Sequence, residues 1–276
     1  AISISECEDM KQLGLSHAHV QDALIETARH LLNLGFNLAY GGDPNYVKEF
    51  NFTELLLQLA RTYRSEARHA PRISLYLAFP VYTKITARRE AELKGIASII
   101  RVSPPEWKSW ERKREETATH HEKEFLKKLF ENSDMESKMI WANSLTLMRS
   151  RMAQDVNTRI VIGGKLETFK GKYPGILEET LIDLAGGNKV FLLDTMGGCA
   201  KLISDLVKRD RVPALQALKS RQKEFIAYHN SKVPKQEVDY DGLHNLLQKR
   251  KKHLSIYSDK EIDGLMADLT NHVSRH

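Results

Sequence analysis

Apolar positions along the chain alternate between short continuous runs and longer stretches in which they recur at helical spacing. The short runs predict six strands: Ile2–Ser5, Phe36–Tyr40, Ile73–Phe79, Ala97–Val102, Thr158–Ile162 and Lys189–Leu193. The longer stretches between them predict helices, for example His17–Leu34 and Glu136–Met152. Strands that alternate with helices in this way are typical of a mostly parallel sheet covered on both faces. We therefore predict a doubly wound α/β fold with about six strands.

The last quarter of the chain has a different pattern, without a convincing strand after about Asp210. Three charged helical stretches follow, Pro213–His229, Asp241–Lys252 and Ser258–Arg275. We expect a sheet domain over residues 1–207 and a C-terminal helical extension over residues 208–276, packed on the sheet domain or on a partner. A further long, charged helix is predicted from Trp107 to about Phe130.

Composition narrows the class of protein. The 276 residues carry 42 basic and 36 acidic side chains, a net charge of +6, which suits an anionic ligand and argues against a nucleic-acid partner. No apolar run approaches the ~20 residues of a membrane helix, so we expect no membrane contact.

Two cysteines provide neither a disulfide framework nor a zinc site, so we expect no metal and a reducing cytoplasm. The start of the chain has no signal-peptide features, and we expect one domain of a longer protein.

Glycine pairs follow three of the predicted strands, at Gly41-Gly42, Gly163-Gly164 and Gly197-Gly198. Glycine lets a backbone approach a phosphate closely, and a following helix N-terminus offers free N–H groups. Parallel sheets bind ligands beyond the carboxyl ends of their strands. Ser5 at the end of the first strand and Asp43 after the first glycine pair are placed at the same edge. The pattern predicts a phosphate-bearing ligand, with ordinary turn chemistry as the alternative.

Charged residues around the second glycine pair are the strongest candidates for binding. Lys165 lies just past the strand, where its ammonium can reach a phosphate. Glu178 and Glu179 lie in the first turn of the helix after Pro174-Gly175, where a carboxylate can accept ribose hydroxyls or stabilise a positive ribosyl centre; helix-dipole complementation is the alternative. Arg149 or Arg151, near the end of the preceding helix, can fork onto a phosphate, unless both are solvated.

These motifs resemble the SLOG superfamily, a Rossmann-like group that joins the LOG-type phosphoribohydrolases with the Smf-type DNA-processing proteins. The resemblance spans roughly residues 1–207 and rests on Tyr40–Asp43, Leu147–Met152, Gly163-Gly164 and Pro174–Glu179. It implies that Glu179 is the motif's final glutamate and that Arg149 or Arg151 is the family arginine. In the hydrolase branch this Arg–Glu pair acts on the ribose–base bond of a nucleoside monophosphate.

The chain departs from the hydrolase pattern at two places. A loop from Lys165 to Tyr173 splits the compact glycine motif, and Ile176 replaces its threonine. The loop adds Lys170 and Lys172, which suit a larger and more anionic ligand.

A second branch is closer in motif, the sensor domains of prokaryotic antiviral systems such as Thoeris. These hold a signalling nucleotide related to ADP-ribose with an Arg, a Lys and a Glu, an order that Arg149, Lys165 and Glu179 fit. The resemblance implies a homo-oligomeric nucleotide sensor, linked to a fused or partner effector and needing no cofactor besides its ADP-ribose-related or cyclic nucleotide. The alternative is a nucleotide N-glycosidase of the phosphoribohydrolase or NAD glycohydrolase type, with Glu179 and Arg149 as catalytic residues.

Overall fold

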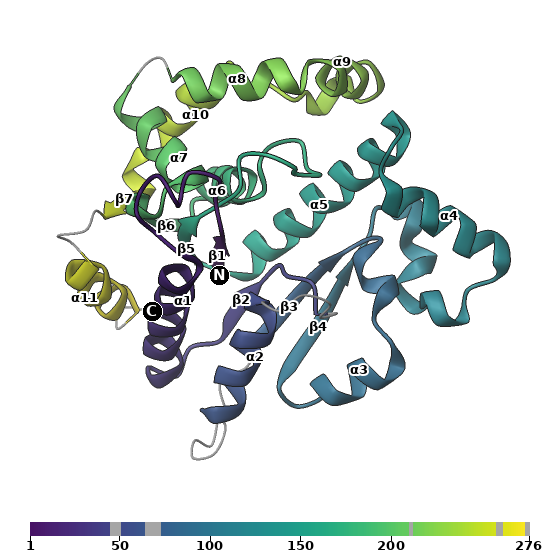
Figure 1. Ribbon diagram of the computed structural model, residues 1–276, viewed down its shortest axis with the longest axis horizontal. Helices are drawn as coiled ribbons and strands as arrows, with labels where there is room; N and C mark the ends of the chain where they lie inside the picture. Colours follow the sequence, from purple (N-terminus) through teal and green to yellow (C-terminus); the bar gives the residue numbers. More distant parts are fainter. Residues whose placement is uncertain (45–50, 64–72, 210–211, 258–261, 274–276) are drawn as a thin grey trace.

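A computed structural model describes residues 1–44, 51–63, 73–209, 212–257 and 262–273, and it confirms the α/β class (Figure 1). The six predicted strands are all present: β1 Ile2–Ser5, β2 Leu38–Tyr40, β3 Ile73–Ala78, β4 Ala97–Val102, β5 Thr158–Gly163 and β6 Lys189–Leu193. Every pairing between described strands is parallel. The strands are apolar runs because helices cover both faces of such a sheet.

The strands form two sheets instead of one six-stranded sheet, in the orders β1-β5-β6-β7 and β2-β3-β4. β1 and β2 contact each other where the two sheets meet. From β1 the chain continues to β2 on one side, whereas β5 pairs with β1 on the other side in a register that sets Ser5 beside Gly163. The strand order therefore reverses at β1, which is where an open α/β sheet binds its ligand.

A seventh strand corrects the prediction that none follows Asp210. β7, Leu254–Tyr257, pairs with β6 in parallel and forms the edge of the sheet. Four residues after a run of lysine and arginine are too few to show the period of a strand, and three of the four are only half-buried. The pairing of β7 with β6 connects the last part of the chain directly to the sheet.

The helices of the sheet domain are α1 His17–Asn33, α2 Phe52–Thr62, α3 Ala87–Leu93, α4 His120–Glu131, α5 Met135–Asp155, α6 Gly175–Gly186 and α7 Gly198–Lys208. The predicted helix from Trp107 to Phe130 is wrong, because two short 3-10 helices, Pro105–Arg112 and Glu115–Thr117, precede α4. Thr119 caps α4, and Glu122 accepts the Thr119 backbone N–H in return. Such a capping box begins a new helix at that residue.

The remaining helices are α8 Pro213–Arg221, α9 Lys223–Lys232, α10 Leu243–Arg250 and α11 Ile262–Val273. Leu215 and Leu243 belong to the core that also contains residues of α6 and α7, and in Figure 1 α8 and α10 lie above these helices while α9 lies above α5. Leu265 and Leu269 of α11 join the core beneath α1. The C-terminal helices therefore bury their apolar faces against the sheet domain.

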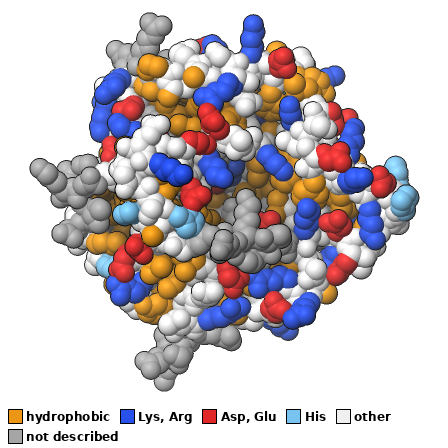
Figure 2. Space-filling view, viewed as in Figure 1, with side chains coloured by type: hydrophobic (Ala, Val, Ile, Leu, Met, Phe, Trp, Pro, Cys, Tyr) orange, Lys and Arg blue, Asp and Glu red, His pale blue; other side chains and the backbone are white. Residues whose placement is uncertain are grey.

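The surface carries charges of both signs, and Figure 2 shows Lys and Arg side chains interspersed with Asp and Glu over the face in view. None of the described helices combines the length and the apolar character that crossing a membrane requires.

Candidate functional site

A cavity of about 270 Å³ opens at the point where the strand order reverses. Its walls come from β1, from the turn after β2, from the loop after β5 and from the start of α6. The lining residues are Ile2, Ser3, Ile4, Ser5, Tyr40, Gly41, Lys165, Glu167, Thr168, Phe169, Gly175, Ile176 and Glu179. Residues distant in sequence meet here because parallel strands present their carboxyl ends at one edge.

Five of the residues singled out in the sequence line this cavity: Ser5, Gly41, Lys165, Gly175 and Glu179. The others do not line it: Gly42, Asp43, Arg149, Arg151, Gly163, Gly164, Glu178, Gly197 and Gly198. Of the cavity residues that the structure describes, Lys165 is the only cation. The cavity therefore combines one ammonium group with hydroxyl groups and the acidic side chains of Glu167 and Glu179.

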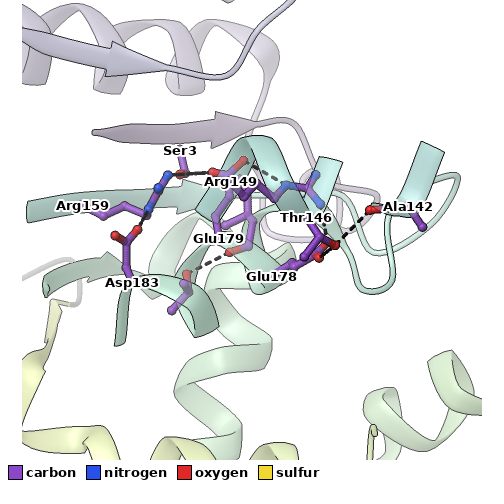
Figure 3. Close-up of polar contacts among 10 residues, drawn as sticks. Ser3, Ala142, Thr146, Arg149, Arg159, Glu178, Glu179 and Asp183 are labelled. Carbon is purple, nitrogen blue, oxygen red and sulfur yellow. Dashed lines mark hydrogen bonds and ion pairs between the residues drawn. The ribbon is translucent and has the colours of Figure 1, made fainter. Parts of the chain in front are cut away.

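Glu179 is fixed in the cavity wall by groups behind it (Figure 3). Its Oε2 accepts hydrogen bonds from Ser3 Oγ and, at 2.8 Å, from Arg159 Nη1. Its Oε1 lies 3.5 Å from Arg149 Nε. The side chain is 12% exposed, so its carboxylate still meets the cavity. The carboxylate is therefore held by two arginines and a serine, and its cavity side can accept hydrogen bonds from a ligand.

Arg159 is a site residue that the sequence analysis did not single out. Its side chain is 0% exposed, and it forms an ion pair with Asp183, which is also 0% exposed, in addition to its bonds to Glu179 and Ser3. A buried arginine requires such partners. Two signals were available in the sequence. Arg159 stands at the start of the apolar run Ile160–Ile162, and Glu179 and Asp183 stand four residues apart, on one face of the following helix.

Arg149 lies directly behind the cavity wall, as part of α5. Its Nη1 donates to Glu178, which also accepts a hydrogen bond from Thr146 (Figure 3). A Cβ at Gly171 would lie 2.7 Å from Arg149 Nη1, and one at Gly175 would lie 2.9 Å from Nη2. Glycine at both positions therefore lets the backbone pass close to the guanidinium.

Arg151, the alternative to Arg149, points to a different place. Its side chain is 55% exposed and pairs with Asp155 at 2.8 Å. The structure thus brings Arg149, and not Arg151, to the two glutamates of α6.

Packing and backbone conformation require glycine in the turns after the strands. A Cβ at Gly42 would lie 2.1 Å from the Tyr40 ring and 2.3 Å from Thr53 Oγ1. Gly164 has a φ of +111°, and its N–H donates to the Ser5 carbonyl at 2.9 Å. The Gly198 N–H donates to the Asp9 carboxylate at 3.1 Å. A Cβ at Gly198 would also lie 2.1 Å from the Gly164 carbonyl oxygen, so close packing or a positive φ accounts for glycine at these three positions.

The other lysines of the Lys165–Tyr173 loop point away from the cavity. Lys170 Nζ lies 3.9 Å from the centre of the Trp141 ring. Lys172 is buried, with Nζ 3.4 Å from Gln236 Oε1. Burial lowers the pKa of both lysines. Only Lys165 of this loop is therefore available to an anion in the cavity.

No group of three or more His, Cys, Asp or Glu side chains within the described parts of the chain could hold a metal ion. A comparison with protein families finds that the family model described as SLOG cluster2 matches residues 1–265. No curated protein matches the chain. The matched region includes the cavity, the buried Arg–Glu network and β7.

Proposed function

Because this chain belongs to the SLOG superfamily, we propose that it is a nucleotide-sensing domain for an ADP-ribose-related or cyclic nucleotide. The observation that carries the proposal is the position of Glu179. This carboxylate lines the cavity at the switch point of the sheet, and Arg159 and Ser3 hold one of its oxygens from behind. A preorganised acceptor of this kind suits the hydroxyl groups of a ribose.

The groups that line the cavity match the ribose and the phosphate of a nucleotide. Glu179 Oε1 accepts from a ribose hydroxyl. Lys165 and the N-terminus of α6 at Gly175 bind a phosphate, because an ammonium group and free N–H groups meet there. Ser5 adds a hydroxyl at the end of β1. Arg149 holds the glutamates of α6 in place and has no direct contact with the cavity.

The biological role is proposed from the resemblance to antiviral sensor domains. Arg149, Lys165 and Glu179 follow one another in the order of those sensors. On this basis the chain acts in the cytoplasm as a homo-oligomer and regulates a fused or partner effector in prokaryotic defence. Binding of the nucleotide changes the packing between subunits and thereby switches the effector.

A second candidate function is hydrolysis of a nucleotide N-glycosidic bond. The same glutamate favours this function, because the Glu179 carboxylate lines the cavity. Its Oε1 lies 3.5 Å from Arg149 Nε. A carboxylate there stabilises the positive charge of a ribosyl centre as the bond to the base breaks.

One experiment tests both functions. Thermal unfolding is measured with AMP, ADP-ribose, NAD, cyclic ADP-ribose isomers and cyclic oligonucleotides, and each sample is then analysed for free base. A ligand at 100 times its Kd adds about 2.7 kcal/mol to the unfolding free energy. The variants are Lys165→Ala and Glu179→Gln, with Lys94→Ala as the control because Lys94 is exposed after α3.

Each outcome leads to a different conclusion. A shift that Lys165→Ala abolishes and Lys94→Ala keeps, with the nucleotide recovered intact, supports the sensor. Release of free base that Glu179→Gln abolishes supports the hydrolase. The absence of both a shift and base release with every nucleotide contradicts both functions.

A further inference from the structure

The loop between Lys165 and Tyr173 forms one wall of the cavity through Glu167, Thr168 and Phe169. The carboxylate of Glu167 forms an ion pair with Arg221 of α8. Thr168 and Phe169 take no part in the buried ion-pair network or in the binding of a phosphate. They are neighbours in sequence and line the same cavity, so they can contact one group of a ligand together.

Thr168 has an unfavourable backbone conformation. Its φ is +53°, in the left-handed region, and among the described residues only one other residue besides glycine, Asn132, has a positive φ. Asparagine adopts this conformation more readily than a β-branched residue does, and glycine adopts it without strain. A threonine at this position therefore lowers the stability of the fold, and strain of this kind is typical of residues that contact a ligand.

The turn that contains Thr168 is held on both sides. The backbone N–H groups of the two residues before it donate to the Glu8 carboxylate, both at 3.0 Å. After it, Lys170 Nζ lies 3.9 Å from the centre of the Trp141 ring. Thr168 itself is exposed, and its hydroxyl has no hydrogen-bond partner within the described parts of the chain. The hydroxyl is therefore available to a ligand at a fixed place in the cavity wall.

Phe169 lies between two cavities. It lines the cavity at the switch point and also a second cavity of about 150 Å³, which Met135 of α5 and Phe225 of α9 line as well. Its side chain is half-buried and packs against the apolar core that contains Phe225 and residues of α6. Protein interiors are close-packed, so an aromatic side chain that borders two cavities has fewer packing partners than one inside the core. A flat group in the first cavity would complete its contacts.

A nucleotide base has the shape and the polarity that these two residues can bind. The faces of a base are flat and stack on aromatic side chains, whereas its edge carries hydrogen-bond donors and acceptors. Under the proposed function the ribose and the phosphate have their partners in Glu179 and Lys165. Phe169 offers an aromatic ring, and Thr168 a hydroxyl beside it, in the same cavity.

We infer that Thr168 and Phe169 form the base subsite of this cavity, where Phe169 packs against the face of the base and the Thr168 hydroxyl forms a hydrogen bond to its edge. The inference rests on the proposed function and deepens it, because it assigns a third part of the nucleotide to named residues. It also separates nucleotides from sugar phosphates, which have no base and gain nothing from the subsite.

The test compares AMP with ribose 5-phosphate, which has the same sugar and phosphate but no base. Titration calorimetry measures both Kd values for the wild-type chain, Phe169→Leu and Phe169→Tyr. Phe36→Leu is the matched control, because Phe36 is also half-buried but lines a different cavity. Thermal unfolding confirms that each variant is folded at the temperature of the titration. If another nucleotide of the thermal panel binds more tightly than AMP, it takes the place of AMP.

We expect the wild-type chain to bind AMP at least about tenfold more tightly than ribose 5-phosphate, equivalent to ~1.4 kcal/mol. Phe169→Leu keeps an apolar side chain but removes the aromatic face, so it should raise the Kd of AMP about tenfold and that of ribose 5-phosphate less than about twofold. Phe169→Tyr keeps the aromatic face and should leave the Kd of AMP within about threefold of the wild-type value. Phe36→Leu should change neither Kd.

A second pair of variants tests Thr168. Thr168→Val keeps the branched side chain and its backbone strain but removes the hydroxyl, so it should raise the Kd of AMP about threefold without changing that of ribose 5-phosphate. Thr168→Ser keeps the hydroxyl and should leave the Kd of AMP unchanged. A purely structural role of Thr168 would change both Kd values together and would overturn its place in the subsite.

Two results would overturn the inference alone. One is a wild-type chain that binds ribose 5-phosphate as tightly as AMP, and the other is a ratio of the two Kd values that Phe169→Leu leaves unchanged. A chain that binds neither compound, nor any other nucleotide of the thermal panel, overturns the proposed function together with this inference.

Discussion

Arg159 Nη1 donates to Glu179 Oε2 at 2.8 Å, so an arginine of strand β5 holds the glutamate that lines the cavity. The same guanidinium pairs with Asp183, one turn further along α6. One buried side chain thereby connects the sheet to two carboxylates of the helix that borders the cavity. The position of the cavity carboxylate and the stability of the fold depend on the same residue.

Replacing Arg159 should therefore destabilise the protein strongly. Arg159→Met leaves Asp183 without its cation and Glu179 with Arg149 alone, and breaking a buried ion pair from one side costs about 3–5 kcal/mol. We expect a loss of this size in the unfolding free energy, measured by urea denaturation followed by circular dichroism.

Arg151→Met is the control for this measurement. The side chains of Arg151 and Asp155 are 55% and 31% exposed, and removal of such a pair at the surface costs less than about 1 kcal/mol. Equal losses for the two variants would show that the buried network contributes no more than a surface ion pair.

Arg149 and Arg151 should also differ in their effect on nucleotide binding. Arg149→Met removes the partner of Glu178 and the cation beside Glu179 Oε1, so the cavity carboxylate keeps only Arg159 and Ser3, which hold its other oxygen. We expect the Kd of the bound nucleotide to rise at least about tenfold, equivalent to ~1.4 kcal/mol, when both proteins are fully folded. Arg151→Met should leave Kd unchanged. Titration calorimetry measures both, and a larger effect of Arg151→Met would contradict the assignment.

Much of the fold could be predicted because buried parallel strands are continuous apolar runs. β1 and β6 begin and end at the predicted residues, Ile2–Ser5 and Lys189–Leu193. β7 could not be predicted, because its four residues follow a basic run and form an edge strand that is largely half-buried. The start of α4 was missed because a charged stretch carries little periodicity, although Thr119 and Glu122 had the spacing of a capping box.

For the candidate site too, the sequence predicts features that depend on neighbouring residues but not those that depend on tertiary packing. Glycine turns and charges after strands identify one edge of the sheet, and Lys165 and Glu179 do line a cavity there. The sequence does not show that the Gly198 N–H is already bonded to Asp9, 189 residues away. It also does not show that Arg159 turns inward to α6, because that depends on how the helix packs on the strand.

Two glycine-to-alanine substitutions should have opposite effects on stability. Gly164 has a φ of +111°, and a Cβ there would lie 2.8 Å from the Cβ of Cys199 and 2.9 Å from Ile176. Gly164→Ala should lower the unfolding free energy by about 1–3 kcal/mol or more, because both the backbone conformation and the packing exclude a side chain.

Gly186→Ala is the matched substitution in the last turn of α6. A Cβ there meets nothing within 4 Å, and its φ is not positive. This variant should raise the unfolding free energy by about 0.4–1 kcal/mol, since alanine reduces the freedom of the unfolded chain. Thermal unfolding measures both variants, and a neutral Gly164→Ala would show that the turn after β5 is less tightly packed than the structure indicates.

His229 should make stability depend on pH. The side chain is 0% exposed, and burial, together with the nearby Lys172, lowers the pKa of its imidazole. The folded protein therefore keeps His229 neutral at a pH where the unfolded chain, with a pKa of ~6.5, takes up a proton. Because the unfolded state then binds more protons, the unfolding free energy falls as the pH is lowered below about 6.5.

The contribution of His229 to this slope is at most about 1.4 kcal/mol per pH unit. Urea denaturation at pH 7, 6 and 5 measures it, and His229→Gln should flatten the decrease because glutamine does not titrate. His120→Gln is the control, since His120 is exposed at the start of α4 and its removal should leave the slope as in the wild type. A slope that persists unchanged in His229→Gln would contradict this assignment.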